Sequence, residues 1–453
     1  MPPADLVVIS DRVVTPEGVR PAAVVVEDGW IKAIEPLRAA PSARRLVDAL
    51  DAVVFPGLVD AHVHLNEPGR SDWEGFESGT RAAAAGGVTT VIDMPLNSVP
   101  ATTTVTALAL KARAATGRAA VDYSFWGGLV PGSEGELAAL TKAGVRGFKC
   151  FLVPSGVDEF PSVTAADLEP AMARLAVLGV PLLVHAEAPG VIERAAGAPG
   201  DPRRYATYLA SRPPEAELEA IDLVLDLCRR TGCAVHVVHL SAAGALGPLA
   251  AARRAGLPVT VETCPHYLTF TAEEIPDGAT AFKCAPPIRE RDNRERLWDG
   301  LAQGVIDFVA SDHSPAPAAL KRLDSGDFLR AWGGVSSLEL LLSATWTEAR
   351  DRRHDFGDLA RWLAERPASL AGLTSKGRIA PGWDADLVIW DPDATVTVDP
   401  HRLNHRHPVT PYEGKTLRGR VLQTFVRGAS VYEDGQFPGR PRGEWAKPTQ
   451  ESS

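Results

Sequence analysis

The sequence of 453 residues predicts an α/β protein, a (β/α)₈ TIM-like barrel with a small β-sandwich domain formed by both chain termini. Between about residues 54 and 314, eight apolar strand-like runs alternate with Ala- and Leu-rich runs typical of helices. The two ends of the chain are instead rich in Val, Ile and turn dipeptides. A doubly wound open sheet would also alternate strands with helices, but no GxGxxG motif follows the first barrel strand.

The two chain ends are predicted to fold into one β-sandwich. Residues 1–54 contain the runs LVVIS, RVVT and AAVVVEDGWIKAI, in which Asp28-Gly29 is a hairpin signal. Residues 376–453 contain DADLVIWDPDATVTV and LRGRVLQTFVRGASVYEDG, which have a similar β-rich composition. Because chain ends commonly lie close together, we expect these segments to pack beside a barrel that spans residues 55–375.

The eight predicted barrel strands follow one another at the spacing of a barrel. In order, they are VVFPGLVDAHVH, VTTVIDMP, VDYSFWGGL, VRGFKCFL, PLLVHAE, AVHVVHLS, PVTVETCP and IDFVASDHS. Helical segments lie between most of them, such as TVTALALKARAATG, EGELAALTKAG and EAELEAIDLVLDLCRRTG. This alternation is the pattern expected of parallel strands with a helix after each.

The composition narrows the class of protein. With 45% hydrophobic residues the chain can bury a large core, and its formal net charge of −10 argues against nucleic-acid binding. No apolar run approaches the roughly 20 residues of a membrane span, and the N-terminus lacks the pattern of a signal peptide. The five cysteines include no CxxC pair, which favours reduced thiols. We therefore expect a cytoplasmic protein that binds neither nucleic acid nor membranes.

Side chains that can bind a metal stand at the carboxyl ends of five predicted barrel strands, where the functional sites of such barrels lie. His62 and His64 are two residues apart at the end of the first strand, so alternation puts both on one face. The other strand ends carry Lys149, His185, His239 and Asp312. Imidazole and carboxylate groups suit zinc and related metals, so the pattern predicts a metal site.

Three other histidines are expected to have structural roles. His236 lies three residues before His239, so the two face opposite ways on a strand, and His239 at the strand end is the candidate ligand. His313 points away from Asp312 by the same alternation. His266 falls just past the seventh strand, where we expect it to be structural or to support a ligand.

Lys149 is the unusual member of the set, because an ammonium group beside two dications would be repelled. A buried lysine readily loses its proton. The neutral amine can then take up carbon dioxide to give a carbamate, a carboxylate able to bridge two metals about 3.5–4 Å apart. A lysine that extends from a strand end towards solvent is the alternative interpretation.

The motifs DAHVHLNEPG, GFKCFL, HAE, VVHLS, ETCPHYL, KCAPPIR and SDHSP together resemble the cyclic amidohydrolases of the amidohydrolase superfamily, and among them the allantoinases. The resemblance extends over nearly the whole chain, including GRIAPGWDADLVIWDP and HPVTPYEGKTLRGRV. It implies a barrel with a terminal β-sandwich, two divalent metal ions and often a homotetramer. The ions are usually zinc, although cobalt and manganese also suit such ligands.

The resemblance also implies a role for each candidate ligand. Two divalent ions would share six ligands: His62, His64 and Asp312 on the more buried ion, His185 and His239 on the more exposed ion, and carbamylated Lys149 as the bridge. A hydroxide shared by the two ions would attack the ring amide carbonyl. Asp312 would accept the proton of this hydroxide and return it to the leaving nitrogen.

Departures from neighbouring members of the family indicate the substrate. Dihydroorotases typically carry an arginine two residues after the second histidine, where this chain has Asn66. Dihydropyrimidinases and hydantoinases usually have a tyrosine five residues after the bridging lysine, where this chain has Pro154. The implied substrate is therefore the uncharged cyclic ureide allantoin, bound by hydrogen bonds rather than by an arginine.

Four residues are candidates for substrate contacts by resemblance. They are Asn97 and Ser314, through their side chains, and Cys284 and Ala285, through backbone groups. An ordinary turn residue is the alternative interpretation of Asn97. The segment CFLVPSGVDEFPSVT, which follows Lys149, is a candidate mobile lid.

Two other functions are compatible with parts of this pattern. A related hydantoinase or dihydropyrimidinase would act on other cyclic ureides, but the missing tyrosine disfavours it. A metal-free homologue with a structural role would be expected to lose ligand histidines or the bridging lysine. All six predicted ligands are present here.

Overall fold

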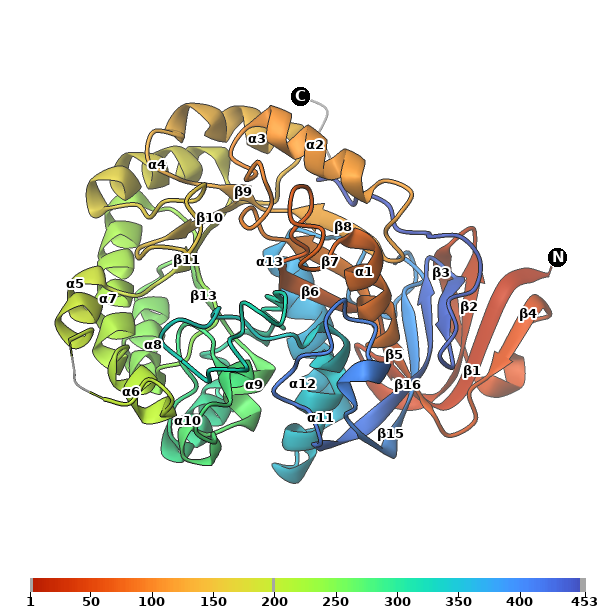
Figure 1. The fold of residues 1–453 in the computed structure, drawn as a ribbon. Coiled ribbons are helices and arrows are strands. Elements are labelled where there is room, and N and C mark those ends of the chain that lie inside the picture. The colour runs from red at the N-terminus through yellow and green to blue at the C-terminus, as the bar shows by residue number, and fades with distance from the viewer. Residues whose placement is uncertain (1–2, 198–199, 449–453) are drawn as a thin grey trace.

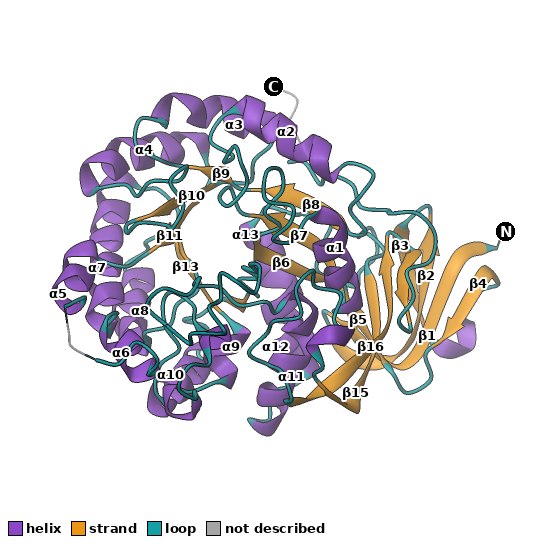
Figure 2. Cartoon of the chain, viewed as in Figure 1, coloured by secondary structure: helices purple, strands orange, loops and turns teal. Residues whose placement is uncertain are grey.

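The computed structural model describes residues 3–197 and 200–448 and shows a barrel of parallel strands beside a twisted sheet built from both ends of the chain (Figure 1). The predicted fold class is confirmed. Helices surround the barrel strands, whereas the terminal sheet stands to one side with little helix of its own (Figure 2).

The barrel wall is made of short parallel strands. They are β6 (Leu58–Val63), β7 (Val88–Asp93), β8 (Asp122–Phe125), β9 (Gly127–Gly128), β10 (Phe148–Phe151), β11 (Leu182–His185), β12 (Val235–Val237), β13 (Val259–Thr263) and β14 (Phe308–Val309). β8 and β9 together occupy the place of the single predicted third strand. The ring closes where His64 N donates to the His313 carbonyl at 2.8 Å and Val63 bridges His313 in parallel.

The helices form the outer layer of the barrel (Figure 1). They are α1 (Phe76–Ala85), α2 (Val105–Ala115), α3 (Leu137–Ala143), α4 (Ala165–Leu178), α5 (Pro189–Ala195), α6 (Tyr205–Ala210), α7 (Pro214–Thr231), α8 (Leu246–Arg254), α9 (Pro265–Thr269), α10 (Arg291–Ala302), α11 (Leu341–Asp351), α12 (Phe356–Ala360) and α13 (Arg366–Leu370). The longer helices bury an apolar stripe towards the barrel, as Leu168, Met172 and Leu175 of α4 show. None of the described helices combines the length and the apolarity needed to cross a bilayer.

The terminal sheet contains β1 (Ala4–Thr15), β2 (Gly18–Glu27), β3 (Trp30–Glu35), β4 (Ala43–Asp48), β5 (Val53–Pro56), β15 (Leu387–Thr397), β16 (Thr416–Val426) and β17 (Ala429–Glu433). The first half of β1 pairs with β4, and its second half pairs with β5. An irregularity between Ser10 and Val13 separates the two halves, and such bulges bend a strand. β1 therefore belongs to both halves of the terminal sheet, the half with β4 and the half with β5. Val8, Val54 and Leu387 are among the residues of the buried apolar cluster that these strands form.

The predicted first barrel strand, Val53–His64, is in fact two strands in two different sheets. β5 pairs antiparallel with β15, with Phe55 opposite Val388, and β6 begins only after Gly57. A Cβ atom on Gly57 would lie 2.3 Å from Thr89 Oγ1, so the chain can cross between the sheets only without a side chain there. Phe55 and Pro56 thus pair with a strand of the terminal sheet. The predicted domain boundaries, with the barrel at residues 55–375, stay a prediction.

The barrel and the terminal sheet are joined by buried charges and by the chain end. Lys376 Nζ lies 2.6 Å from an Asp122 oxygen of β8 and 2.7 Å from an Asp386 oxygen beside β15. After β17 the chain returns to the barrel, where Trp445 packs edge-on against Phe125. All five cysteines are buried and free.

Candidate metal centre and active-site cavity

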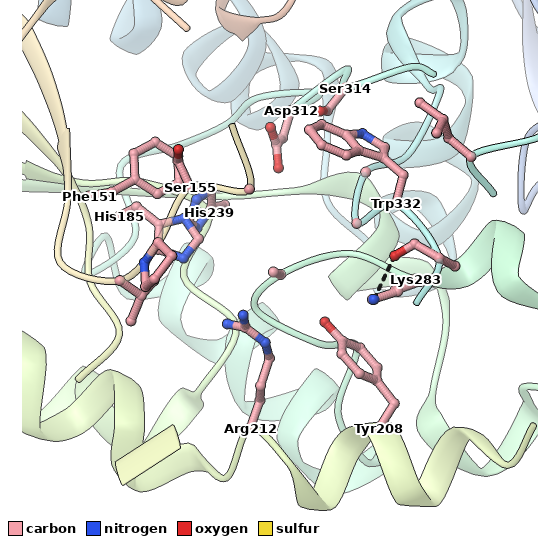
Figure 3. Close-up of a pocket in the computed structure, with 18 of the residues that line it drawn as sticks. Phe151, Ser155, His185, Tyr208, Arg212, His239, Lys283, Asp312, Ser314 and Trp332 are labelled. Carbon is pink, nitrogen blue, oxygen red and sulfur yellow. Dashed lines mark hydrogen bonds between the residues drawn. The ribbon is translucent and has the colours of Figure 1, made fainter. Parts of the chain in front are cut away.

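A cavity of about 550 Å³ opens at the carboxyl ends of the barrel strands. Phe151, His185 and His239 lie on one side of it and Asp312, Ser314 and Trp332 on another (Figure 3). This is the end of the barrel at which the predicted ligands were expected to meet.

His62 and His64 converge on Asp312. His62 Nε2 lies 3.2 Å and His64 Nε2 lies 3.6 Å from Asp312 Oδ1. The ligand atoms of the three residues lie within 4.8 Å of one another, and all three residues are buried. Asp312 has a φ of 43°, a left-handed conformation that turns its side chain away from the direction of a regular strand. This set can hold a divalent ion.

His185 and His239 form the neighbouring pair. Their ring centroids are 4.5 Å apart, and the His239 ring lies 5.5 Å from that of His62. The His185 ring stacks on Phe151 at 4.5 Å. His239 follows β12 in a left-handed conformation with a φ of 39°, and its Nδ1 has no hydrogen-bond partner among the described residues.

Lys149 lies on β10 and is fully buried. Its Nζ has no hydrogen-bond partner among the described residues and lies 5.0 Å from the centroid of the Phe151 ring. Burial lowers the pKa of Lys149 to about 8, although the carboxylates of Glu262 and Asp312 favour the ammonium form. The fraction of neutral amine that can react with carbon dioxide near neutral pH is therefore larger than for an exposed lysine.

These residues fit a pair of divalent ions. Buried polar atoms without a partner are rare in folded proteins, yet Lys149 Nζ and His239 Nδ1 are both of this kind. Burial is also the main cause that lowers the pKa of His64, His185 and His239, so their imidazoles are neutral, as metal ligands must be.

The three histidines with expected structural roles lie outside this set. His236 contacts Glu262 Oε2 at 3.0 Å through Nε2 and stacks on Phe308, and His313 Nε2 contacts Glu74 at 3.3 Å. His266 lies closer to the centre, because its ring, Cys264 Sγ and Asp312 also come within 4.8 Å of one another. Burial raises the pKa of Cys264 well above its usual value, so this group offers a thiol rather than a thiolate and is the poorer metal site.

Two buried carboxylates beside the histidines, Glu262 and Glu187, were not among the predicted site residues. Glu262 accepts from His62 Nδ1 and, at 3.3 Å, from the backbone N of His239. Glu187 contacts His185 Nε2 at 2.7 Å. A signal for Glu262 was present, because a glutamate in the apolar run VTVET needs a buried partner.

The candidate substrate residues are placed differently from one another. Asn97, Ser314 and Ala285 line the cavity, and Asn97 Nδ2 lies 3.4 Å from His64 Nδ1. Cys284 is not among the lining residues, but its carbonyl accepts from Tyr208 Oη at 2.6 Å. Asn66 does not line the cavity either, because its side chain donates to the Pro315 carbonyl at 3.4 Å.

Several other residues that line the cavity were not predicted from the sequence. They are chiefly Tyr208, Arg212, Lys283 and Trp332, which come from the segment around α6, from the loop between α9 and α10 and from the long loop after β14. The candidate lid contributes Val153, Pro154, Ser155 and Gly156.

Comparison with known proteins agrees with this geometry. The sequence model of the Amidohydrolase family matches residues 53–431. An allantoinase of Streptomyces avermitilis is 53% identical over 98% of this chain and 98% of its own length. An allantoinase of Arabidopsis thaliana is 46% identical over 94% of this chain and 88% of its own. Among solved structures, the L-hydantoinase (dihydropyrimidinase) of Arthrobacter aurescens has a TM-score of 0.92 at 33% identity, covering 98% of this chain and 100% of that one.

Proposed function

The chain belongs to the amidohydrolase family, and we propose that it is an allantoinase-type enzyme that hydrolyses the cyclic amide bond of allantoin to give allantoate. The observation that carries the chemistry is the convergence of four histidines and Asp312 around the unpartnered amine of Lys149. The substrate rests on the similarity to proteins named allantoinase over nearly the full length of the chain.

Two divalent ions are part of this proposal. The more buried ion would be held by His62, His64 and Asp312, the more exposed one by His185 and His239, and both by carbamylated Lys149. Bound ions would polarise the ring carbonyl and make a water between them nucleophilic near neutral pH. Zinc suits this nitrogen and oxygen ligand set best, with cobalt or manganese as alternatives.

Asp312 would move the proton. Burial raises the pKa of Asp312, but His62 and His64 outweigh this effect and lower it below its usual value, so the carboxylate is ionised. It can therefore accept the proton of the attacking water and deliver it to the leaving ring nitrogen. Asp312 lines the cavity, where the ring and the attacking water would meet.

The cavity would recognise an uncharged ring by hydrogen bonds. Asn97 and Ser314 would contact the amide groups through their side chains, and Cys284 and Ala285 through their backbone. Asn97 Oδ1 supports this role, because it is buried and has no partner among the described residues. Tyr208 would hold the Cys284 carbonyl in place.

We further propose that the enzyme is cytoplasmic and forms a homotetramer. The five buried free cysteines are consistent with a reducing compartment. The tetramer rests on family analogy alone. The acidic net charge of −10 disfavours a nucleic-acid partner.

One substrate panel tests the function. Protein loaded with zinc, cobalt or manganese would be assayed with allantoin, hydantoin, dihydrouracil and dihydroorotate. We expect allantoin to have the highest kcat/KM. Activity on dihydrouracil or hydantoin but not on allantoin would favour the second candidate, a hydantoinase or dihydropyrimidinase, to which the solved structures are similar. No activity and no bound metal would favour a structural homologue.

A further inference from the structure

Two buried carboxylates contact opposite ring nitrogens of two histidines in the proposed metal centre. Glu262 accepts from His62 Nδ1, whereas Glu187 contacts His185 Nε2 at 2.7 Å. In a neutral imidazole only one nitrogen carries a proton, and an acceptor beside that nitrogen fixes the tautomer. His62 thus presents Nε2 to the site, and His185 presents Nδ1.

Glu187 is held on its other side by Arg212. The same oxygen, Oε2, receives both His185 Nε2 and Arg212 Nη1, while Oε1 has no hydrogen-bond partner among the described residues. The Glu187 side chain is fully buried. The guanidinium of Arg212 reaches from the end of a helix towards the two histidines (Figure 3). Within the described structure, only His185 and Arg212 fix the orientation of this carboxylate.

Arg212 is itself tied to the loop that carries His239. Its carbonyl accepts from Arg289 Nη1 at 3.2 Å, and Arg289 forms a buried ion pair with Glu217 at 2.6 Å. Glu217 Oε1 in turn accepts from the backbone N of Ser241 at 2.9 Å, two residues after His239. One buried network therefore supports both histidines of the more exposed ion.

We infer that Arg212 is a positioning residue that acts through Glu187 to hold His185 with its Nε2 protonated and its Nδ1 directed at the more exposed ion. The inference rests on the proposed binuclear site. Arg212 suits this role because its rigid, always charged guanidinium holds Nη1 against Glu187 Oε2, whereas an ammonium group on a flexible stem fixes the direction less well. Glu262 plays the corresponding part for His62 and also accepts from the backbone N of His239, whereas the one histidine of the described structure that Glu187 contacts belongs to the more exposed ion.

This arrangement predicts that loss of Arg212 weakens the binding of one ion and leaves the binding of the other unchanged. Groups that orient a metal-binding histidine typically change metal affinity by about 10–100-fold when removed. In Arg212→Met, Glu187 can rotate and the tautomer of His185 is no longer fixed. The more exposed ion should then bind about 10–100-fold more weakly, while the ion held by His62 and His64 keeps its affinity.

The experiment titrates metal-free protein with Co²⁺, and visible absorption and metal analysis report the two binding steps. The variants are Arg212→Met, Arg212→Lys and Glu187→Gln, in which glutamine can still accept from His185 Nε2. Arg253→Met is the control, because the Arg253 side chain is about as exposed as that of Arg212 (23% and 21%) and its partner Asp307 lies at the start of β14, at the other end of the barrel. We expect the largest loss in the second step for Arg212→Met, smaller losses for the other two variants and none for the control.

The outcomes separate this inference from the proposed function. A wild-type protein that binds fewer than two ions would overturn the binuclear site. A wild-type protein that binds two ions, with an Arg212→Met variant that binds both equally well, would overturn only the role of Arg212. Equal weakening of both steps, with an unfolding temperature well below that of Arg253→Met, would assign Arg212 a general structural role instead.

Discussion

Arg70 and Glu159 form an ion pair that joins the loop after β6 to the segment after β10. Arg70 also donates to the Asn97 carbonyl at 2.8 Å, and its guanidinium lies 5.2 Å from the centroid of the Trp73 ring. Three loops at the mouth of the cavity are thus fastened by one side chain. Glu159 belongs to the candidate lid, so the pair stabilises the lid in the position that the structure shows.

Breaking this pair should loosen the lid without removing any group from the metal centre. Both side chains are about a quarter exposed, at 23% and 25%, so the pair is worth about 0.5–1 kcal/mol. We expect Glu159→Gln to raise KM for allantoin about 2–5-fold with a smaller change in kcat. A double-mutant cycle with Arg70→Met measures the coupling, and additive effects would show that the pair does not act on the lid.

The same pair should respond to acid in a defined direction. Burial would raise the pKa of Glu159, but the hydrogen bond from Arg70 outweighs it and lowers that pKa. A lowered pKa means that the contribution of the pair is present above about pH 4.3 and is lost as the pH falls through the folded-state value. Proteolysis of the lid segment should therefore accelerate in the wild type as the pH falls through the folded-state pKa of Glu159. In Glu159→Gln the rate of proteolysis should hardly change over the same range.

Replacing Lys149 tests the proposed bridge between the ions. We expect Lys149→Ala to lose activity by roughly 10²–10³-fold or more, because a preorganised charged group at the reacting centre is removed. Its metal content should also fall. Short-chain carboxylic acids should restore part of the activity, since they can fill the place of the carbamate. The exposed Lys32, changed to Ala, is the control, and a Lys149→Ala variant with full activity would remove the bridge from the mechanism.

Much of the candidate site followed from strand periodicity, because alternation and barrel geometry act locally. Alternation separated His236 from His239, and the rim of a parallel barrel brought His62 and Asp312 together. Glu262 could not be placed in this way, because its contact with His62 spans 200 residues and depends on the closed barrel. The direction of the Asn66 side chain could not be predicted either, because its φ of 63° turns it off the strand direction, towards Pro315.

The prediction of the fold was limited in the same way, because local patterns in the sequence do not contain the effect of distant neighbours. The apolar run from Val53 to His64 is continuous in sequence, so local periodicity predicted one strand. The break at Gly57 arises from two distant neighbours, Thr89 and Asp386, that leave no room for a side chain. Only the packing of the barrel against the terminal sheet contains that information.

Glu339 should make the stability of the protein fall between mildly acidic and neutral pH. Its Oε2 accepts from Asn404 N at 2.6 Å and from Asn404 Nδ2 at 3.1 Å. Burial raises the pKa of Glu339 to about 7, so the folded state keeps a proton that the unfolded state loses above about pH 4.3. Stability then falls as the pH rises through this window and is lowest above about pH 7.

Glu339→Gln should remove this dependence, because glutamine can accept the same two hydrogen bonds without a charge. One pKa unit corresponds to about 1.4 kcal/mol, and Glu339 is only partly buried, so we expect the variant to be more stable by about 1–2 kcal/mol at pH 8. The difference should vanish near pH 4. Denaturant unfolding at both pH values measures it, with the exposed Glu413→Gln as control. A variant less stable than the wild type at pH 8 would contradict the proposed origin of the shift.

Lys376 should be the most sensitive charged residue between the barrel and the terminal sheet. Its Nζ lies within 2.9 Å of oxygens of Asp122, Asp384 and Asp386, and all four side chains are buried. Lys376→Met would leave these carboxylates without their shared cation, and removing one partner of a buried ion pair typically costs 3–5 kcal/mol. We expect a loss of about that size at pH 8, measured by denaturant unfolding.

The loss should shrink as the pH falls, because protonation relieves the repulsion among the three carboxylates, of which Asp122 keeps its ion pair with Arg427. Burial already raises the pKa of Asp386 in the presence of Lys376, so without this cation Asp386 should take up a proton at still higher pH. At pH 5 the variant should therefore lie closer to the wild type than at pH 8. Arg378→Met, which breaks the more exposed pair with Glu365, should change stability by about 1 kcal/mol or less at either pH. A pH-independent loss in Lys376→Met would mean that packing of the lysine stem, rather than its charge, joins the two domains.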